Sequence, residues 1–368
     1  MNRDEAIEAA KLIKALIGMS EVSIILDTFI TTIQENSFKH DDWWWLCGNL
    51  KFGPQSGRLA SSEPNLQNLP SGSTYGKLIK SCIVAPPGWL WCAADFNALE
   101  DRIGAIRSGD KNKIKEFAEG YDGHSLRAHA FFSKRIHPEL AVFDGDDPNS
   151  INLIKSQYPK YRGAAKAPSF ALQYGGSYYT LMQNLGLSED DAKEIESGYH
   201  ALYQGIADFS QRNIEFAQKN GYVECAFGLR LRTPVIKDWG QRSGKAPYPV
   251  TAEGRSANNA VTQSWGQLIN RAAIATEKRI RESEFDHDIL GSNLIHDAGY
   301  FLVKEDPATI KFLNDVLIEE MEWNDHPDIK SSEVLLGAEL DIGRSWDNMI
   351  TLDNKLSLQD ITEALSTL

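Results

Sequence analysis

Two aspartates far apart in the chain each stand where a predicted β-strand ends. Asp95 closes the continuous apolar run of residues 88–96, and Asp297 follows His296 in a turn between two short predicted strands within residues 292–303. Two hard carboxylates, with open positions left for phosphates, are what a pair of magnesium ions requires. Acids at strand ends are also common as solvated side chains or helix caps. The spacing alone leaves both interpretations open.

A second group of side chains recurs every four residues within residues 162–176. It consists of two cations followed by two aromatic rings, Arg162, Lys166, Phe170 and Tyr174. On a helix they share one face, where the cations could hold a triphosphate and a ring could stack on a sugar or base. An amphipathic helix with core aromatics and solvated cations fits the same spacing. Pro168 should kink this helix, because it removes the backbone hydrogen bond to residue 164.

Two further segments, residues 57–70 and 255–267, are rich in amides and arginines. In the second, Arg255, Asn259 and Gln263 also step by four, so their side chains could face one groove of a nucleic-acid duplex. Amides suit minor-groove acceptors that different base pairs share, so such contacts would sense duplex geometry rather than sequence. Turn chemistry and capping explain the first segment equally, and an ordinary polar helix face explains the second.

The composition is that of a globular protein. The chain has 368 residues, of which 42% are hydrophobic, and its formal net charge is -13. This charge counts against a simple basic nucleic-acid binder, although a cleft can be locally basic while acidic outer helices dominate the sum. The sequence has no charged-then-apolar leader and no uninterrupted apolar run near the roughly 20 residues that a membrane helix needs. We therefore expect a soluble protein, a cytoplasmic location and no membrane partner.

The elements around these groups predict an α+β fold, in which a small sheet carries acids at its strand ends and a large helical insertion separates them. Residues 4–35 predict two short amphipathic helices that separate near Gly18, and residues 53–73 predict an ordered loop or a linker. Residues 97–109 predict a helix capped by Asn97. The remaining expectations are a mostly helical middle over 110–254, two strands within 292–303 and a helix after Pro307.

Six blocks of the sequence, taken together, resemble the conserved blocks of family A DNA polymerases, especially those of the bacteriophage branch. In chain order they are 57–70, 95–102, 162–176, 255–263, 296–297 and 343–349. Six independent patterns in the family's order are far more specific than any one motif. The resemblance therefore adds weight that the spacing of single groups does not carry.

The resemblance implies a right-hand polymerase fold of the α+β class, with a palm sheet, large helical fingers and a shortened helical thumb. The implied segments are a thumb remnant and connector (1–56), a first part of the palm (57–100), the fingers (101–254) and a second part of the palm (255–368). The implied activity is template-directed DNA synthesis, in which dNTPs are added to a primer 3′ end by two-metal-ion nucleotidyl transfer. The chain would be the polymerase part of a phage replicative enzyme that lacks its own 3′-5′ exonuclease.

The resemblance also implies roles for individual residues. Asp95 and Asp297 would hold two Mg²⁺ ions, with the main-chain carbonyl of Phe96 completing the metal shell. The residues implied to bind the incoming dNTP are Arg162 and Lys166 at the triphosphate, Phe170 on the sugar, Tyr174 at the templating position, His124 at the phosphates and Glu100 as a gate against a ribose 2′-hydroxyl. The residues implied to contact primer-template DNA are Arg58, Arg255, Asn259, Gln263 and His296, with Asn65, Gln67 and Asn68 lining the same duplex.

Three features depart from the family pattern. Ala298 follows the second acid where the family usually has a glutamate, so that auxiliary carboxylate is missing, and Pro168 falls in the helix that should close on the nucleotide. Only 56 residues precede the Gly57-Arg58 pair, where the family has a longer thumb and an exonuclease domain. We therefore expect a separate exonuclease and thumb chain or a processivity factor as partners, or else a minimal or truncated enzyme.

Two other functions stay open at this stage. A single-subunit RNA polymerase shares the palm acids and a related fingers helix, although Glu100 and the 65–68 segment favour DNA synthesis. An inactive nucleic-acid-binding subunit that keeps the polymerase fold is compatible with Ala298.

Overall fold

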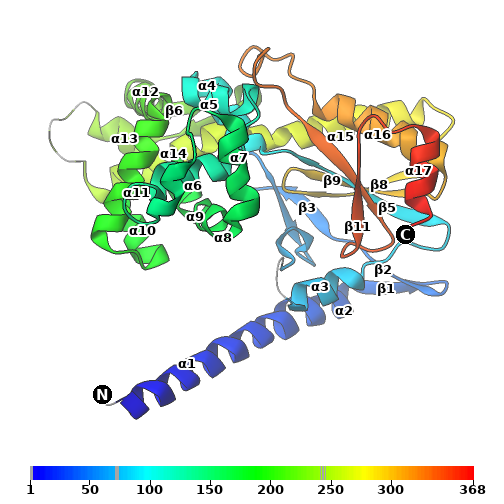
Figure 1. Cartoon of the computed structure of the whole chain (residues 1–368). Helices are drawn as coiled ribbons and strands as arrows, with labels where there is room; N and C mark the ends of the chain where they lie inside the picture. The colour runs from blue at the N-terminus through cyan, green and yellow to red at the C-terminus, as the bar shows by residue number, and fades with distance from the viewer. Residues whose placement is uncertain (1–2, 71–73, 241, 243, 245) are drawn as a thin grey trace.

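The computed structural model describes residues 3–70, 74–240, 242, 244 and 246–368, and it confirms the predicted α+β class. Figure 1 shows a helical body beside a β-sheet that carries helices on one face, with a long N-terminal helix extending away beneath both. The sheet and the helical body are built from interleaved parts of the chain. Sheet residues therefore come from before and after the helical insertion, as the sequence predicts.

The sheet has five strands in the order β11–β10–β5–β9–β8, and each neighbouring pair is antiparallel. The strands are β5 (Trp89–Phe96), β8 (Ile289–Ile295), β9 (Ala298–Lys304), β10 (Ala338–Gly343) and β11 (Met349–Leu352). The central strand β5 is the apolar run predicted as a buried strand. The β8–β9 hairpin turns at His296 and Asp297, which confirms the predicted pair of strands around this turn.

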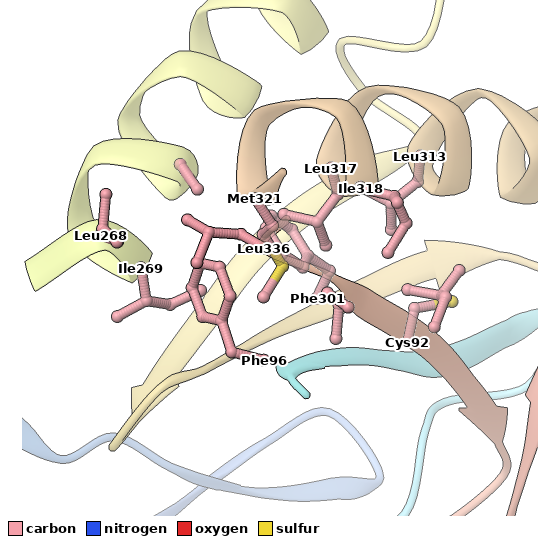
Figure 2. Packing of buried hydrophobic residues seen from close by; sticks show 14 of the residues in the cluster. Cys92, Phe96, Leu268, Ile269, Phe301, Leu313, Leu317, Ile318, Met321 and Leu336 are labelled. Carbon is pink, nitrogen blue, oxygen red and sulfur yellow. The ribbon is translucent and has the colours of Figure 1, made fainter. Parts of the chain in front are cut away.

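Helices cover one face of this sheet. They are α15 (Leu268–Arg281), α16 (Pro307–Met321) and α17 (Leu358–Leu365). Figure 2 shows Cys92 and Phe96 of β5 and Phe301 of β9 packed with Leu317 and Met321 of α16. Because successive residues of a strand alternate between faces, burial of Phe96 directs Asp95 to the opposite face of the sheet. The packing of the core thus decides where the acid points.

The helical body contains two further hydrophobic cores. One is formed by buried residues within 121–203, and the other by buried residues within 217–261. Its α-helices are α4 (Leu99–Ser108), α5 (Lys111–Ala118), α6 (Gly123–Phe132), α7 (Pro148–Gln157), α8 (Pro159–Ala164), α9 (Lys166–Gln173), α10 (Tyr178–Leu185), α11 (Glu189–Leu202), α12 (Gln204–Asn220), α13 (Pro234–Trp239) and α14 (Tyr248–Gln263). Short elements between them are the 3-10 turns η3 (Pro138–Val142), η4 (Ala226–Gly228) and η5 (Ser264–Gln267) and the hairpin of β6 (Tyr222–Glu224) with β7 (Arg230–Arg232).

The N-terminal region differs from the prediction. One continuous helical rod, made of α1 (Arg3–Ile24), a π-helical stretch η1 (Ile25–Ile30) and α2 (Thr31–Asn36), replaces the two short helices. Gly18 lies inside α1, because a glycine within a helix costs only about 1 kcal/mol and need not end it.

The next segment is also more regular than its loop-like composition predicts. It forms two hairpins, β1 (Ser37–His40) with β2 (Trp43–Leu46) and β3 (Asn49–Phe52) with β4 (Leu59–Ser62), followed by the 3-10 turn η2 (Leu66–Asn68) and α3 (Thr74–Ser81). The predicted loop over 53–73 is wrong for β4 and η2, where backbone pairing and turn formation override a composition rich in Gly, Ser and Asn. Residues 71–73 of that loop lie outside the described residues.

The membrane expectation also needs a correction. The helix over residues 5–36 is long and apolar enough to cross a membrane by length and composition, with a mean hydropathy of 1.5 in its most apolar window. Charged residues such as Lys14, Glu21 and Asp27 interrupt each apolar run, but they are too few to make the helix polar on average. Only 6% of that window is buried. Length and composition do not separate a membrane helix from a helix that packs against protein.

The helix predicted over 97–109 is α4, but Asn97 does not cap it. The N-cap residue is Ala98, which adopts a left-handed conformation with φ of 54°, and no side chain caps the helix. The backbone N–H of Asn97 instead donates to the carbonyl of Gly337 at 2.8 Å. Because the chain turns at Ala98 between β5 and α4, Asn97 lies one residue before the N-cap position of the helix.

Candidate active site

The register of the sheet brings the two predicted acids together. Asp95 on β5 lies opposite Ala298 on β9, directly after Asp297 in the hairpin turn, and opposite Glu339 on its other neighbour, β10. A pocket of about 340 Å³ has both aspartates in its lining, together with Gln67, Lys80, His296, Tyr300 and Trp346. Two residues predicted from strand ends thus share one cleft.

The electrostatics of Asp95 reflect this pairing. Although Asp95 is exposed to solvent on one side, the protein atoms packed around its carboxylate raise its pKa to about 6, and the negative charges of Asp297 and Asp341 act in the same direction. A hydrogen bond from the backbone N–H of Phe96 opposes the shift. Like charges held close together in this way are characteristic of sites that bind cations or protons.

The turn that carries Asp297 is strained. His296 has a φ of 55°, in the left-handed region that a side chain disfavours, and it occupies the first position of the two-residue β8–β9 turn. Glycine is the usual residue at such a position. A strained residue beside a predicted ligand is typical of a functional site, because the surrounding structure must hold it there.

Arg58 connects the acids of the sheet to the helical body. Its guanidinium donates to Glu100 at 2.6 Å and lies 3.8 Å from Asp297. Glu100 also accepts a hydrogen bond from the hydroxyl of Tyr174, the C-cap residue of α9. Burial is the main reason why the pKa of Glu100 is raised, and Arg58 opposes that shift.

Two glycines make room for this arrangement. A Cβ on Gly266 would come within 2.8 Å of Arg58 Nε, and a Cβ on Gly57, where φ is +76°, would come within 2.5 Å of Gln267 Nε2. The Gly-Arg pair at 57–58 therefore packs directly against η5. This packing orients the guanidinium toward the carboxylates.

The four residues spaced by four do not share a single helix. Arg162 lies on α8, whereas Lys166, Phe170 and Tyr174 follow on α9 and its C-cap, with a break at Ala165. This break confirms the kink predicted from Pro168, which lacks the N–H that would bond to residue 164. The rings of Phe170 and Tyr174 are parallel, with centroids 6.3 Å apart, and the Phe170 ring meets His124 edge-on at 6.2 Å.

Arg162 already has a partner. Its Nε and Nη2 atoms each donate to Asp122 at 2.8 Å, in a two-point ion pair. Lys166 is exposed. Of the two cations predicted to bind a triphosphate, Arg162 is therefore held in an ion pair and Lys166 faces solvent.

His124 lies beside a buried ionic network. Its Nδ1 is 3.2 Å from Arg127, whose guanidinium donates to Asp101 at 2.6 Å and to Glu116 at 2.8 Å. Lys113 adds a second buried cation 3.2 Å from Asp101. Burial lowers the pKa of His124 to about 4, and the neighbouring charges of Arg127 and Arg162 contribute. The imidazole is therefore neutral at physiological pH.

Apart from Arg58 and His296, the residues predicted to contact DNA fall on α14 and on the segment of residues 65–68. Arg255, Asn259 and Gln263 lie on α14 and are all half-buried. In the segment before α3, Asn65 is half-buried, Asn68 is exposed, and Gln67 donates to the carbonyl of Leu294 at 3.0 Å. Arg255 also packs on Gly175 at the end of the Tyr174 segment, where a Cβ would meet its Cγ at 3.0 Å.

Some residues of the site were missed by the sequence analysis. Lys80 and Tyr300 line the pocket of the acids, but their proximity depends on how α3 and β9 pack, which no local pattern indicates. Trp346 falls within the 343–349 block, so its block membership was an available signal. Asp122 lies two residues before His124 and contacts Arg162 across 40 positions of sequence, a pairing that spacing could not show.

A larger pocket of about 720 Å³ lies elsewhere. It is bounded by apolar side chains of the β3–β4 hairpin and α15, such as Phe52 and Ile274, and contains neither of the two aspartates. Size alone would favour it. The chemistry favours the smaller pocket, because only there do the acids, the strained turn and polar side chains converge.

The donor set at Asp95 and Asp297 fits divalent cations that prefer oxygen. Both donors are carboxylates, and a bound cation would relieve the two effects that raise the pKa of Asp95, burial first and repulsion from Asp297 second. Among the described residues, no group of three or more His, Cys, Asp and Glu side chains is arranged to hold a metal ion.

Comparisons with known proteins agree with this geometry. Residues 6–348 match the model of DNA polymerase family A. The chain is 30% identical over 305 residues to a DNA polymerase I of Chloroflexus aurantiacus, an alignment that covers 82% of this chain and 29% of that protein. It is 31% identical over 291 residues to a thermostable DNA polymerase I of Thermus filiformis, covering 79% of this chain and 31% of the relative. The chain thus spans about a third of the length of these relatives.

The fold has a counterpart among solved structures. The POL domain of Pol1 from M. smegmatis, in complex with DNA primer-template and dNTP, superposes with a TM-score of 0.69 at 26% identity. The match covers 89% of this chain and 51% of that one. The architecture is that of a polymerase domain, which confirms the predicted right-hand fold. This chain belongs to DNA polymerase family A.

Proposed function

We propose that this chain is a template-directed DNA polymerase that adds dNTPs to a primer 3′ end by two-metal-ion nucleotidyl transfer. The observation that carries the proposal is an unbroken series of contacts from the sheet to the helical body. It runs from Asp297 to Arg58, Glu100, Tyr174, Phe170 and His124. Residues assigned to metal, sugar and phosphate on sequence grounds are thus physically connected.

In this proposal Asp95 and Asp297 hold two Mg²⁺ ions, with the main-chain carbonyl of Phe96 as a further ligand. When bound, such ions activate an attacking hydroxyl and stabilise the charge on a leaving phosphate oxygen. The protein supplies position: backbone register fixes Asp95, and the strained His296 turn fixes Asp297. The missing glutamate at Ala298 leaves both of these ligands in place.

The helical body supplies the nucleotide contacts in this proposal. Arg162 and Lys166 bind the triphosphate, and Phe170 packs on the sugar. His124 contributes as a neutral hydrogen-bond donor rather than as a charge, because its pKa is lowered to about 4. Tyr174 guards the templating position.

Glu100 serves as the gate against ribose. Its carboxylate is held from two sides, by Arg58 and by Tyr174, so its position near the sugar is restricted. A side chain fixed in this way excludes an additional 2′-hydroxyl sterically. Primer-template DNA is contacted by Arg58, Arg255, Asn259, Gln263 and His296, with Asn65, Gln67 and Asn68 beside them.

The same proposal assigns the segments of the hand. The first and second parts of the palm are 57–100 and 255–368, the fingers are 101–254, and 1–56 are a thumb remnant and connector. The core formed within residues 121–203 lies wholly in the proposed fingers and supports this division, whereas the core within 217–261 crosses the boundary at residue 254 and the sheet core also includes Ile103 and Ala226. We further propose a phage replicative enzyme in the host cytoplasm, assisted by a processivity factor. This part rests on the sequence resemblance alone, and the relatives described above are bacterial.

The test is primer extension by the purified chain with a labelled primer-template, Mg²⁺ and either dNTPs or NTPs. We expect extension with dNTPs and little with NTPs. Synthesis from NTPs without a primer would indicate an RNA polymerase instead. An absence of extension, alone or with an added exonuclease and thumb chain, would favour an inactive DNA-binding subunit.

A further inference from the structure

The ion pair between Arg162 and Asp122 is more than a surface contact. Both donor atoms of one edge of the guanidinium reach the two carboxylate oxygens at 2.8 Å, and the side chains are only 23% and 17% exposed. A two-point Arg–carboxylate pair has the same geometry as an Arg–phosphate pair. Asp122 therefore presents to Arg162 what a phosphate group would present.

Asp122 is itself firmly held. It is the N-cap residue of α6, where its side chain accepts from the backbone N–H of Ser125 at 2.8 Å, and its own N–H donates to Asn152 at 2.6 Å. Burial disfavours its ionised form, but the hydrogen bonds from Arg162 and Ser125 outweigh burial and lower its pKa to about 2. The carboxylate is charged at neutral pH and cannot swing away from α6.

Arg162 has fewer anchors than Asp122, because its hydrogen bonds in this region go to Asp122. It stands on the six-residue helix α8, just before the break at Ala165, whereas its acceptor is anchored to the N-terminus of α6. Asp122, His124 and Arg162 line one pocket of about 300 Å³. A polyphosphate that reaches His124 therefore meets Arg162 while the guanidinium is still bound to Asp122.

We propose that Asp122 holds Arg162 when no nucleotide is present, and that the triphosphate takes Arg162 over by displacing this carboxylate. This inference rests on the proposed function, because it assumes that Arg162 binds the triphosphate. Asp122 is then a positioning residue that keeps Arg162 extended beside His124 and lowers the affinity for polyphosphate through competition. Arg162 is paired both before and after binding, whereas Asp122 loses its cation and keeps the hydrogen bond from the backbone N–H of Ser125.

The decisive variant is Asp122→Asn. Asparagine is as good an N-cap as aspartate, so α6 keeps its cap while the competing charge is lost. We expect the Kd for inorganic tripolyphosphate, measured by calorimetry on the full chain, to fall by about three- to tenfold at low salt, as is typical for loss of one nearby like charge. The KM for dTTP in primer extension should fall with it, with kcat little changed.

Two further variants isolate the cause. Asp147→Asn is the matched control: Asp147 caps α7 through the N–H of Asn149, and no ion pair to it is found among the described residues. It should leave the tripolyphosphate Kd unchanged. In an Arg162→Gln background, Asp122→Asn should have no effect on this Kd, because the competition requires Arg162.

The outcomes are distinguishable. Weaker or unchanged tripolyphosphate binding by Asp122→Asn, in a chain that does extend primers, would overturn the inference and leave the proposed function standing. No extension and no tripolyphosphate binding by the unmodified chain would overturn both. If Asp122→Asn does not fold, Asp122→Ser, which also caps a helix without a charge, takes its place in the same measurements.

Discussion

The palm sheet and the helical fingers hold their functional side chains by different means. In the sheet, Asp95 is fixed by its position in β5, whose neighbours β9 and β10 are hydrogen-bonded in a defined register. In the helical body, Arg162 and His124 are held by other side chains, namely Asp122 and Arg127. Backbone register cannot be exchanged for a ligand, whereas an ion pair can. The geometry of the acids is thus permanent, and that of the cations is conditional on what occupies the site.

The sign of the charge follows the same division. Burial and, to a smaller extent, repulsion between the carboxylates at the sheet raise the pKa of Asp95. The charges in the helical body are neutralised by partners, and burial among cations lowers the pKa of His124. At the sheet, a bound cation would reduce the repulsion between carboxylates. In the helical body, a bound anion must compete with the carboxylates that already pair with the cations.

The largest effect is expected where the backbone fixes the ligand. Asp95→Asn and Asp297→Asn should each reduce primer extension by about a thousandfold or more, because an amide cannot replace a carboxylate at Mg²⁺ and several kcal/mol of charge stabilisation are lost. The stability of Asp95→Asn should not fall, because burial and the neighbouring acids already disfavour the charged carboxylate. Single-turnover extension and urea denaturation measure the two effects.

Asp341→Asn is the control for this pair of variants. Asp341 lies on the neighbouring strand β10, opposite Ala93, and accepts from Thr351 at 2.6 Å. It influences Asp95 only through its charge, so extension should stay within about tenfold of the unmodified chain. A loss as large as that of Asp95→Asn would mean that the catalytic acids are not the predicted pair.

The second prediction tests whether the fingers depend on paired charges. Arg127→Met removes one of the two cations, Arg127 and Lys113, that neutralise the acids Asp101 and Glu116, and should lower the free energy of unfolding by about 3–5 kcal/mol. Arg135 offers the matched control, because it also bridges two acids, Asp191 and Glu194, but is 52% exposed. Arg135→Met should cost less than about 1 kcal/mol. Equal losses in urea denaturation would refute the contrast.

The third prediction concerns sugar recognition at Phe170. This side chain is 45% exposed, and its ring lies against both Tyr174 and His124. In DNA polymerase family A, a phenylalanine at the position of Phe170 accompanies rejection of nucleotides without a 3′-hydroxyl. Phe170→Tyr adds a hydroxyl that can replace the missing one, so incorporation of dideoxynucleotides relative to dNTPs should rise about three- to tenfold, the worth of one hydrogen bond.

Termination ladders report this ratio directly. Phe216→Tyr provides the control, since Phe216 is 39% exposed on α12 and packs against Tyr222 instead. Ladders that do not change for Phe170→Tyr would remove this residue from the sugar contact.

The sequence predicts the sheet far better than the contacts that complete the site. Strand β5 and the β8–β9 turn follow from continuous apolar runs, so both acids could be located without a structure. The kink near residue 164 follows from Pro168, because proline acts locally. The prediction of two short helices over residues 4–35 was wrong because Gly18 is a weak helix breaker. Strand β4 was missed because backbone pairing overrides a composition rich in polar residues.

The interactions of the fingers could not be predicted, since they join residues distant in the chain. Asp122 meets Arg162, and Arg127 meets Asp101, only after α6 packs against α4 and α8. Single charged residues carry no periodic signal that names a partner. Such pairs require tertiary structure, and they are the contacts on which conditional binding depends.

The last prediction uses pH to separate the two regions in metal-free buffer. His124 has a pKa of about 4 in the folded chain, against an ordinary value near 6.5, so the unfolded state takes up a proton first as the pH falls. This histidine should therefore cost about 1 kcal/mol of stability between roughly pH 7 and pH 5.5. Asp95, whose pKa is raised to about 6, has the opposite sign, because the folded state takes up the proton first and is stabilised over that range.

Urea denaturation at the two pH values distinguishes these contributions. His124→Gln should reduce the loss of stability on acidification, although not abolish it, since burial also lowers the pKa of His129. Asp95→Asn should increase the loss, because the compensating gain at the sheet disappears. If His124→Gln and Asp95→Asn changed the loss of stability on acidification in the same direction, the two groups would not affect stability with opposite signs. The contrast between the sheet and the helical body would then be refuted.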